Sequence, residues 1–183
     1  MRISEDRYDR DRQRLELALR FLTHEARTQT IRAWTGLTDD RIRKLYRSYL
    51  GHAACYVPRH RGKSPHQAAY FTRSLRIQQE TAVLASFFAL AGLVPAEPLP
   101  AAGATLPNIA RGDSLCNAFE AYANLIPTAA ISFEYAVFLA ECLARGDQLR
   151  LGRCCDCGGI MVVERFPIRD KPCQHCTVAA QRR

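Results

Sequence analysis

Five of the eight cysteines of this 183-residue chain lie in one short segment, CCDCGGIMVVERFPIRDKPCQHC, at residues 154–176. Two C-x-x-C pairs, Cys154 with Cys157 and Cys173 with Cys176, are separated by fifteen residues. This spacing is typical of four-cysteine zinc sites, and thiolates are soft ligands that suit Zn²⁺ in a tetrahedron. We therefore expect one structural zinc ion bound by these four thiolates.

The ligand set has two alternatives, and the cluster has one other interpretation. Cys155 could replace Cys154, or His175 could replace Cys176, but each exchange leaves a one-residue spacer that suits a knuckle less well. A redox dithiol would explain one C-x-x-C pair but not two, and no thioredoxin-like βαβ pattern surrounds the pairs. Four thiolates fill the coordination shell, so the predicted metal is structural rather than catalytic. Cys155 is the spare thiol, and we expect it to lend a backbone N–H to a neighbouring sulfur.

A small zinc ribbon or double knuckle is predicted around these cysteines, within residues 150–183. Gly158 and Gly159 permit the positive-φ turn of a knuckle after the first pair. The stretch IMVVERF predicts a short strand, and PIRDKP predicts a return turn. Because so small a unit has little core, metal binding would supply much of its folding free energy, on the order of 10 kcal/mol.

The positive charge of the chain is concentrated in one block. The net charge is +8, and residues 27–76 hold eleven basic against two acidic side chains. Such a block is the electrostatic footprint of a protein that binds a polyanion, with nucleic acid as the first candidate. The alternative interpretation is a solvated basic face without a ligand.

A helix–turn–helix segment is predicted within this basic block. Ile31 and Trp34 are apolar positions of a first helix, which Gly36 ends because glycine readily adopts positive φ. Thr38 is a suitable N-cap for a second helix, whose inner face would carry Ile42 and further apolar side chains. Its solvent face would carry the basic side chains that contact DNA: Arg41, Arg43, Lys44 and Arg47. A helical hairpin without a DNA role is the alternative.

The segments on either side of this motif are predicted from periodicity and from turn residues. A first helix is expected over about residues 11–24, because apolar residues recur there at three- and four-residue spacing. Residues 52–65 are a predicted loop, in which Arg59, Arg61 and Lys63 would reach DNA phosphates.

A long helix is expected after this loop and as far as about Leu90. Ser64 would be its N-cap, with Pro65 at the first helical position and Gln67 completing a capping box. Core candidates along the helix are the aromatic and aliphatic residues Phe71, Leu75, Val83, Leu84, Phe87 and Phe88.

The second half of the chain is also predicted to be helical up to the cysteine cluster. A proline-rich loop at 93–108 precedes two helices at about 110–125 and 128–145. The predicted fold class is therefore mainly α, with a helical domain at residues 1–149 that binds DNA and a partner. The zinc ribbon and a short basic tail form the second domain, at residues 150–183.

The other reactive side chains form no catalytic pattern, so we do not expect an enzyme. Cys55, Cys116 and Cys142 are isolated, as buried structural cysteines usually are. The histidines outside the cluster have no carboxylate at a useful spacing: His24, His52, His60 and His66. Signatures such as G-x-S-x-G and H-E-x-x-H are absent from the sequence.

A cytoplasmic protein is expected from the apolar pattern. The longest apolar stretch, residues 82–94, is too short to span a bilayer, and the N-terminus has no signal-peptide pattern. In a reducing compartment, clustered cysteines more often bind metal than form disulfides.

The sequence resembles the C subunit of the bacterial flagellar master transcription regulator, the FlhC family. The resemblance covers about residues 17–176, from EARTQT…GLTDDRIRKLY…G through GKSP and Tyr70-Phe71 to GDQLRLGRCCDCGG…CQHC. The zinc cysteines of the family map onto the four ligands proposed above. Two departures are the additional cysteine and basic residues in HAACYVPRHRGK, and Tyr70 where the family tends to have tryptophan.

The resemblance implies a DNA-binding transcriptional activator. It implies a partner, the flagellar regulator D subunit (FlhD), in a hexamer of four D and two C subunits that activates flagellar operons with RNA polymerase. The zinc ribbon would either contact double-stranded promoter DNA, through Arg165, or only brace the helical domain. The alternatives are a zinc-stapled protein-interaction adaptor without a DNA role, and a paralogous regulator of a different regulon.

Overall fold

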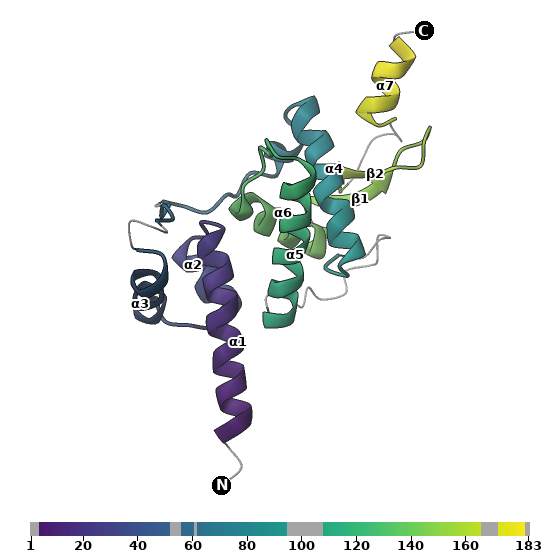
Figure 1. The fold of residues 1–183 in the computed structure, drawn as a ribbon. Helices are drawn as coiled ribbons and strands as arrows, with labels where there is room; N and C mark the ends of the chain where they lie inside the picture. Colours follow the sequence, from purple (N-terminus) through teal and green to yellow (C-terminus); the bar gives the residue numbers. More distant parts are fainter. Residues whose placement is uncertain (1–3, 52–55, 61, 95–107, 166–171, 182–183) are drawn as a thin grey trace. The chain divides into compact units, whose positions relative to one another are not determined.

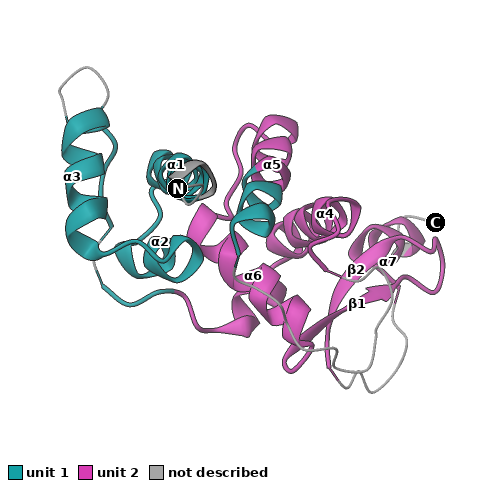
Figure 2. Cartoon of the chain, turned by 90° about the horizontal axis from the view of Figure 1, so that it is seen from below, with its two compact units in different colours: residues 1–64, 105–116 teal, residues 65–104, 117–183 magenta. Residues whose placement is uncertain are grey.

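A computed structural model of the chain describes residues 4–51, 56–60, 62–94, 108–165 and 172–181. The elements run in the order shown in Figure 1. Contacts divide the chain into two compact units, coloured in Figure 2. Unit 1 comprises residues 1–64 and 105–116, and unit 2 comprises residues 65–104 and 117–183. The helix α5, Ile109–Leu125, contributes its first half to unit 1 and its second half to unit 2.

Three helices of unit 1 contact one another pairwise: α1 (Ser4–Thr23), α2 (Thr28–Thr35) and α3 (Asp39–Tyr49). Their core includes the rings of Phe21 and Trp34, whose centroids lie 5.9 Å apart, and the fully buried Ile42. The start of α5 joins them through Gly112, where a Cβ would come within 2.5 Å of the Leu17 side chain. The first helix is longer than predicted, because it begins at Ser4 rather than near residue 11.

The turn between α2 and α3 has the predicted local structure. Gly36 has a φ of 68° and its N–H bonds to the Arg32 carbonyl, so glycine relieves the strain of the left-handed conformation. The Thr38 side chain caps α3 by accepting a hydrogen bond from the N–H of Arg41, at 3.4 Å. The Gly36 turn and the Thr38 cap each depend on residues close in sequence, which is why the position of this turn could be predicted from the sequence.

Unit 2 combines helices with a two-stranded sheet. Its helices are the 3₁₀-helix η2 (Ala68–Thr72), α4 (Leu75–Leu90), the end of α5, α6 (Phe133–Arg145) and α7 (Gln174–Gln181). The strands β1 (Leu149–Arg153) and β2 (Ile160–Glu164) pair antiparallel, from Leu149 opposite Glu164 to Arg153 opposite Ile160. The helix α4 contacts η2, α6, β2 and α7, and therefore organises the unit.

The core of unit 2 is mainly aromatic and aliphatic. Phe71, Leu84 and Phe88 were predicted core residues and are buried, at 1% exposure or less. Leu75 was also predicted to be buried but is 41% exposed, because it is the first residue of α4 and faces away from the core.

Two predicted helix starts in unit 2 are wrong. The helix expected to begin at Pro65 begins ten residues later, at Leu75, where the Ser74 hydroxyl accepts the N–H of Ile77 at 3.3 Å. The intervening residues form a separate 3₁₀-helix instead. The helix expected from residue 128 begins at Phe133.

The cysteine segment belongs to unit 2, together with the helices that precede it. The division expected at residue 149/150 therefore does not coincide with the compact units, since β1 contacts α6 and β2 contacts α4. The roles assigned to the two predicted domains, DNA and partner binding at residues 1–149 and zinc binding at residues 150–183, stay predictions. Across the residues that the structure describes, no helix combines the length and the apolar character needed to traverse a bilayer.

Candidate metal centre and basic surface

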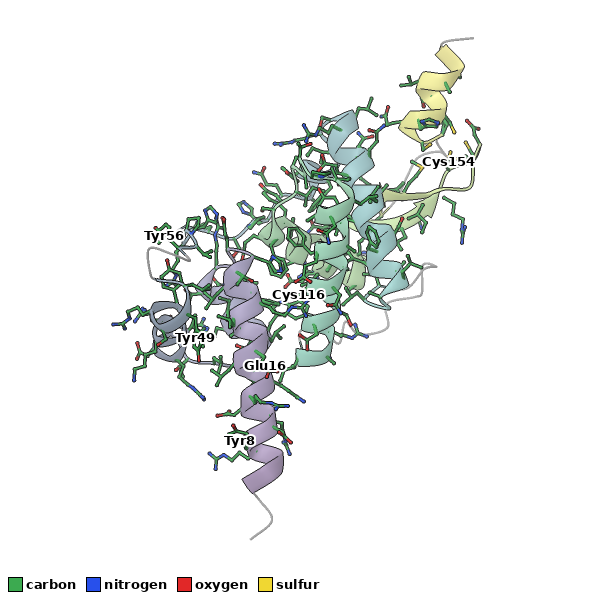
Figure 3. All side chains as sticks on the ribbon, in the orientation of Figure 1. Tyr8, Glu16, Tyr49, Tyr56, Cys116 and Cys154 are labelled. Carbon is green, nitrogen blue, oxygen red and sulfur yellow. The ribbon has the colours of Figure 1, made fainter. Side chains whose placement is uncertain are left out.

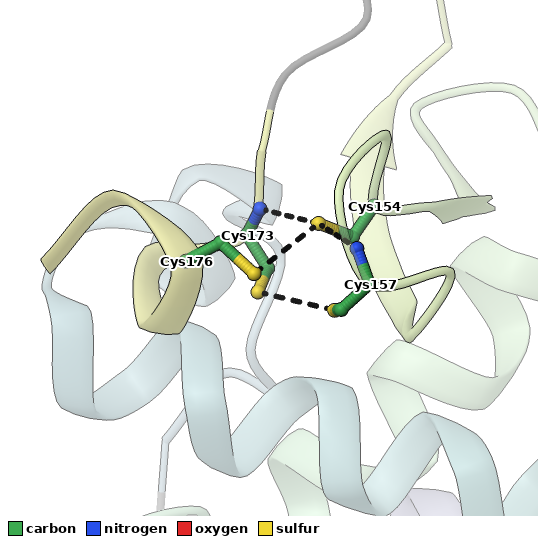
Figure 4. A group of neighbouring side chains, drawn as sticks. All are labelled: Cys154, Cys157, Cys173 and Cys176. Carbon is green, nitrogen blue, oxygen red and sulfur yellow. Dashed lines mark hydrogen bonds between the residues drawn. The ribbon is translucent and has the colours of Figure 1, made fainter. Parts of the chain in front are cut away.

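The sulfur atoms of Cys154, Cys157, Cys173 and Cys176 converge at one point of unit 2, all within 4.8 Å of one another. Figure 4 shows the two pairs facing each other. The Sγ atoms of Cys154 and Cys176 are 3.9 Å apart, and those of Cys157 and Cys173 are 3.8 Å apart. A tetrahedral zinc ion with Zn–S bonds near 2.3 Å requires S···S separations of about 3.8 Å. Two of the S···S distances match this value, and the four thiols are close enough to one another to hold a metal ion.

The first cysteine pair lies in the loop that connects β1 to β2. Gly158 adopts a φ of 68° and donates to the Cys154 carbonyl at 3.0 Å, and the Cys154 N–H donates to the Gly159 carbonyl at 2.9 Å. The predicted positive-φ turn is thus confirmed at Gly158. The second pair lies at the start of α7, where Cys173 precedes the helix and Cys176 lies in its first turn.

Backbone amides surround the most buried of the four sulfurs. Cys154 is 3% exposed, and its Sγ accepts from the N–H groups of Cys157 at 3.5 Å, Cys173 at 3.0 Å and Asp156 at 3.4 Å. The hydrogen bonds from Cys157 and Cys173 are the main reason that the pKa of the Cys154 thiol falls to about 6. These donors favour the thiolate, which is the form that binds a metal.

Cys155 lies outside the convergent set. Its side chain is exposed, and its thiol donates to the Asp156 carboxylate at 3.4 Å. The three amides found at the Cys154 sulfur belong to Asp156, Cys157 and Cys173, and not to Cys155 as expected. His175 is exposed and is also outside the set of four. The geometry therefore favours the ligand set chosen from the spacing.

The basic residues predicted on the second helix lie on the exposed side of α3. Arg41, Arg43, Lys44 and Arg47 are all exposed, whereas Ile42 between them is fully buried. Side chains with nitrogen ends extend outward from α3 near Tyr49 (Figure 3). Arg41 forms an ion pair with Asp11 at 3.1 Å, and Arg43 forms one with Asp40 at 3.0 Å. Their charges are partly balanced, unlike that of Lys44, for which the described residues provide no ion pair.

The predicted loop after α3 folds back on unit 1. The Tyr46 hydroxyl donates to the Val57 carbonyl at 2.7 Å, and the Arg59 guanidinium lies 5.2 Å from the centre of the Tyr46 ring. Arg59 also donates to the Thr28 hydroxyl. Lys63 is exposed, and its carbonyl accepts from Arg27. Arg61, predicted to contact DNA, lies outside the described residues.

Arg165 follows β2 on the surface of unit 2. Its side chain is exposed, and its N–H donates to the Gln148 carbonyl at 3.0 Å, which continues the hairpin by one residue. It is placed with the cysteine ribbon and not with the basic residues of unit 1. The DNA contacts assigned to all these basic residues stay a prediction.

The structure gives one histidine a carboxylate partner that the sequence spacing does not indicate. His60 has a carboxylate partner, because its Nε2 lies 2.6 Å from an oxygen of Glu25. Glu25 has a φ of 61°, an uncommon conformation for a residue other than glycine, at the end of α1. The two residues are 35 positions apart, so no sequence spacing could reveal the pair. The prediction of buried structural cysteines is confirmed for Cys116 and Cys142, while Cys55 falls outside the described residues.

A buried carboxylate of unit 2 was not predicted at all. Glu80 is 4% exposed, and its oxygens accept from the Tyr122 hydroxyl at 2.5 Å, the Ala130 N–H at 2.7 Å and Arg76 at 2.8 Å. The spacing of Arg76 and Glu80, one helical turn apart, was the only local signal of this network. Because Glu80 binds the Ala130 amide and Arg76 binds the Thr128 carbonyl, this stretch is held as a turn and α6 begins only afterwards.

Comparison of the chain with protein-family models and with curated proteins found no match.

Proposed function

We propose that this protein is a zinc-containing, DNA-binding transcriptional regulator of the kind found in the FlhC family. The observation that carries the proposal is the arrangement of α3, which packs its apolar side on α1 and α2 and presents Arg41, Arg43, Lys44 and Arg47 to solvent. A three-helix unit with one exposed basic helix suits insertion into the major groove of duplex DNA.

The loop after α3 extends the proposed contact surface. Arg59 and Lys63 are exposed beside the same helices and would neutralise backbone phosphates. The ion pairs of Arg41 with Asp11 and of Arg43 with Asp40 would open when the guanidinium groups exchange carboxylates for phosphates. Exposed ion pairs of this kind contribute only about 0.2–1 kcal/mol, so their loss is a small cost against phosphate contacts.

The metal in this proposal is one zinc ion. Cys154, Cys157, Cys173 and Cys176 would hold it as thiolates, and four sulfur ligands leave no open position for a substrate or water. The ion would connect the β1–β2 loop to the start of α7. Cys157 in the loop and Cys173 before the helix are sixteen positions apart in the sequence. Its role would be to brace the ribbon, with Arg165 available at the base of the hairpin for a phosphate contact.

The partners come from the family resemblance. We propose the D subunit of the flagellar regulator as the hetero-oligomeric partner, and RNA polymerase as the machinery that the complex recruits at flagellar operons. A regulon other than the flagellar one would be consistent with the same site, since promoter choice depends on contacts with bases that the resemblance leaves open.

The test is a mobility-shift experiment on flagellar promoter DNA, with the full chain in the presence and absence of the D subunit and of a zinc chelator. We expect a retarded complex that requires the chain, is strengthened by the D subunit and weakens after chelation. Absence of a shift under every condition would contradict DNA binding. In that case the rival function, an adaptor whose basic helix binds an acidic protein, would explain the surface better.

A further inference from the structure

Unit 1 contains a cavity of about 460 Å³ beside the start of α2. Three arginines line it, Arg27, Arg43 and Arg59, together with His60 and with Thr28 and Gln29 of the first turn of α2. The arginines come from three different segments: the residue before α2, the exposed side of α3, and the loop that follows α3. Cationic groups that converge on one cavity from separate segments are suited to binding an anion.

The cationic groups of this cavity are held in place by other residues. Arg59 lies over the Tyr46 ring and donates to the Thr28 hydroxyl, while Arg27 donates to the Lys63 carbonyl. His60 is held by Glu25, 2.6 Å away. A ligand would therefore meet side chains that have already lost much of their rotational freedom, which lowers the entropic cost of binding.

The acidic groups near the cavity do not cancel its positive charge. Asp39 lines the cavity, but an oxygen of its carboxylate lies 3.7 Å from the guanidinium of Arg32. Asp40 pairs with Arg43 at 3.0 Å and Glu25 pairs with His60, so each offsets one of the lining groups in part. Arg59 makes its polar contact with the Thr28 hydroxyl, which leaves its full charge in the cavity.

The start of α2 adds backbone donors to these side chains. Its N-cap residue, Arg27, makes no side-chain cap hydrogen bond, and the first turn has no acidic residue. The first amides of a helix have no partner within the helix, and the positive end of its dipole lies there. An anion in the cavity would accept hydrogen bonds from these amides and would be attracted by the positive end of the helix dipole.

We propose that this cavity binds a phosphate group, supplied either by the DNA backbone or by a free phosphoester. Phosphate offers acceptor oxygens and negative charge, one unit on a backbone diester and up to two on a free monoester, which match the converging guanidinium groups. With DNA as the source, the inference deepens the proposed function by assigning one backbone phosphate to a built site. With a free phosphoester as the source, it holds independently of DNA binding.

The test uses Gln29→Glu, a substitution that separates binding from folding. A carboxylate in the first turn of α2 favours the helix dipole, so the fold should be retained or slightly stabilised. The same carboxylate would repel an anion from the cavity. Gln13→Glu, at an exposed position of α1, is the matched control, because it makes the same change of charge in the same unit.

The first arm titrates the full chain with inorganic phosphate at constant ionic strength, and follows the backbone amides of Thr28 and residue 29 by NMR. We expect saturable shifts in the wild type and in Gln13→Glu, and a dissociation constant at least about tenfold weaker in Gln29→Glu, equivalent to 1.4 kcal/mol. Shifts that are absent, or equal in the two variants, would overturn the proposal.

The second arm measures affinity for promoter duplex as a function of salt. If DNA is the source, Gln29→Glu lowers the slope of log affinity against log salt by about one, and Gln13→Glu leaves it unchanged. Phosphate binding without DNA binding would support the cavity, assign it to a free phosphoester and contradict the proposed function. DNA binding without a phosphate response, and with equal slopes in the two variants, would overturn the cavity proposal and leave the proposed function standing.

Discussion

At the scale of single residues, the cysteine cluster distinguishes four side chains from a fifth that is next to them in sequence. Cys154 is buried and receives three amide hydrogen bonds, whereas Cys155 is exposed and its thiol donates to the Asp156 carboxylate. Neighbouring cysteines therefore have opposite environments, and this difference gives a direct test of the ligand set.

Substitution of a ligand should remove the metal, and substitution of the spare thiol should not. We expect one zinc per chain in the wild type and in Cys155→Ser, and much less than one in Cys176→Ser, measured by elemental analysis after gel filtration. Loss of a structural zinc removes a contribution on the order of 10 kcal/mol to the local fold. The ribbon amides of Cys176→Ser should then exchange with solvent much faster. Equal zinc contents in the two variants would contradict the assignment.

Glu80 is the second residue with an unusual environment. Burial is the largest influence on this carboxyl and opposes its ionisation, but the combined hydrogen bonds of Tyr122, Arg76 and Ala130 outweigh it, so the pKa of Glu80 is lowered. Burial, together with the hydrogen bond to Glu80, raises the pKa of Tyr122 well above its usual value. The network holds an ionised carboxylate in the interior of unit 2.

Glu80→Gln should destabilise the protein by about 2–4 kcal/mol, because the amide removes the charge and turns a donor toward groups that themselves donate. Chemical denaturation measures this change. Glu164→Gln, at an exposed position of β2, is the control and should cost less than about 0.5 kcal/mol. A similar effect of the two substitutions would show that the network contributes little.

The pH dependence of this contribution has a definite sign. A carboxyl whose pKa is lower in the folded chain stabilises the fold fully above its unfolded pKa, which is about 4.3 for glutamate, and loses that contribution as the pH falls further. The difference in unfolding free energy between wild type and Glu80→Gln should therefore be constant near neutrality and shrink below about pH 4. A difference that grows on acidification would be evidence against an ionised Glu80.

At the scale of elements, helix caps explain where unit 2 begins its helices. Ser74 is the N-cap of α4 and accepts the N–H of Ile77 at 3.3 Å, while Ser132 is the N-cap of α6 and makes no such side-chain bond. The two serines therefore form a matched pair with the same position and different contacts.

Ser74→Ala should lower the unfolding free energy by about 1 kcal/mol, and Ser132→Ala by less, because only the first substitution removes a capping hydrogen bond. Thermal or chemical denaturation of the two variants checks this order. The reverse order would mean that the cap at Ser74 is weaker in solution than its geometry indicates.

Local signals explain which elements could be predicted. The Gly36 turn, the Thr38 cap and each C-x-x-C pair depend on residues within a few positions of one another, and all three agree with the structure. The start of α6 was predicted too early, since the turn before it is held by Glu80, about fifty residues away.

Non-local contacts were accessible only in the structure. The strand β1 was missed because it is defined by its pairing with β2. The pair of Glu25 with His60, and the cavity beside α2, likewise depend on a loop that returns to distant helices.

At the scale of the whole molecule, the proposed roles follow the distribution of charge. The basic block falls largely in unit 1, where α3, the following loop and the cavity present arginine and lysine side chains, while the metal site belongs to unit 2. We therefore propose that unit 1 makes most of the electrostatic contact with DNA and that a metal ion bound in unit 2 has a bracing role.

The salt dependence of DNA affinity shows whether the basic side chains of unit 1 contact DNA phosphates. Promoter binding by the full chain, with the D subunit present, should weaken linearly on a plot of log affinity against log salt. The double substitution Lys44→Ala with Arg47→Ala should lower that slope by about two, because two phosphate contacts are lost. Arg12→Ala with Arg14→Ala, both in α1, removes the same charge and should leave the slope unchanged. Equal slopes for the two double variants, or no DNA binding by any of them, would contradict the account.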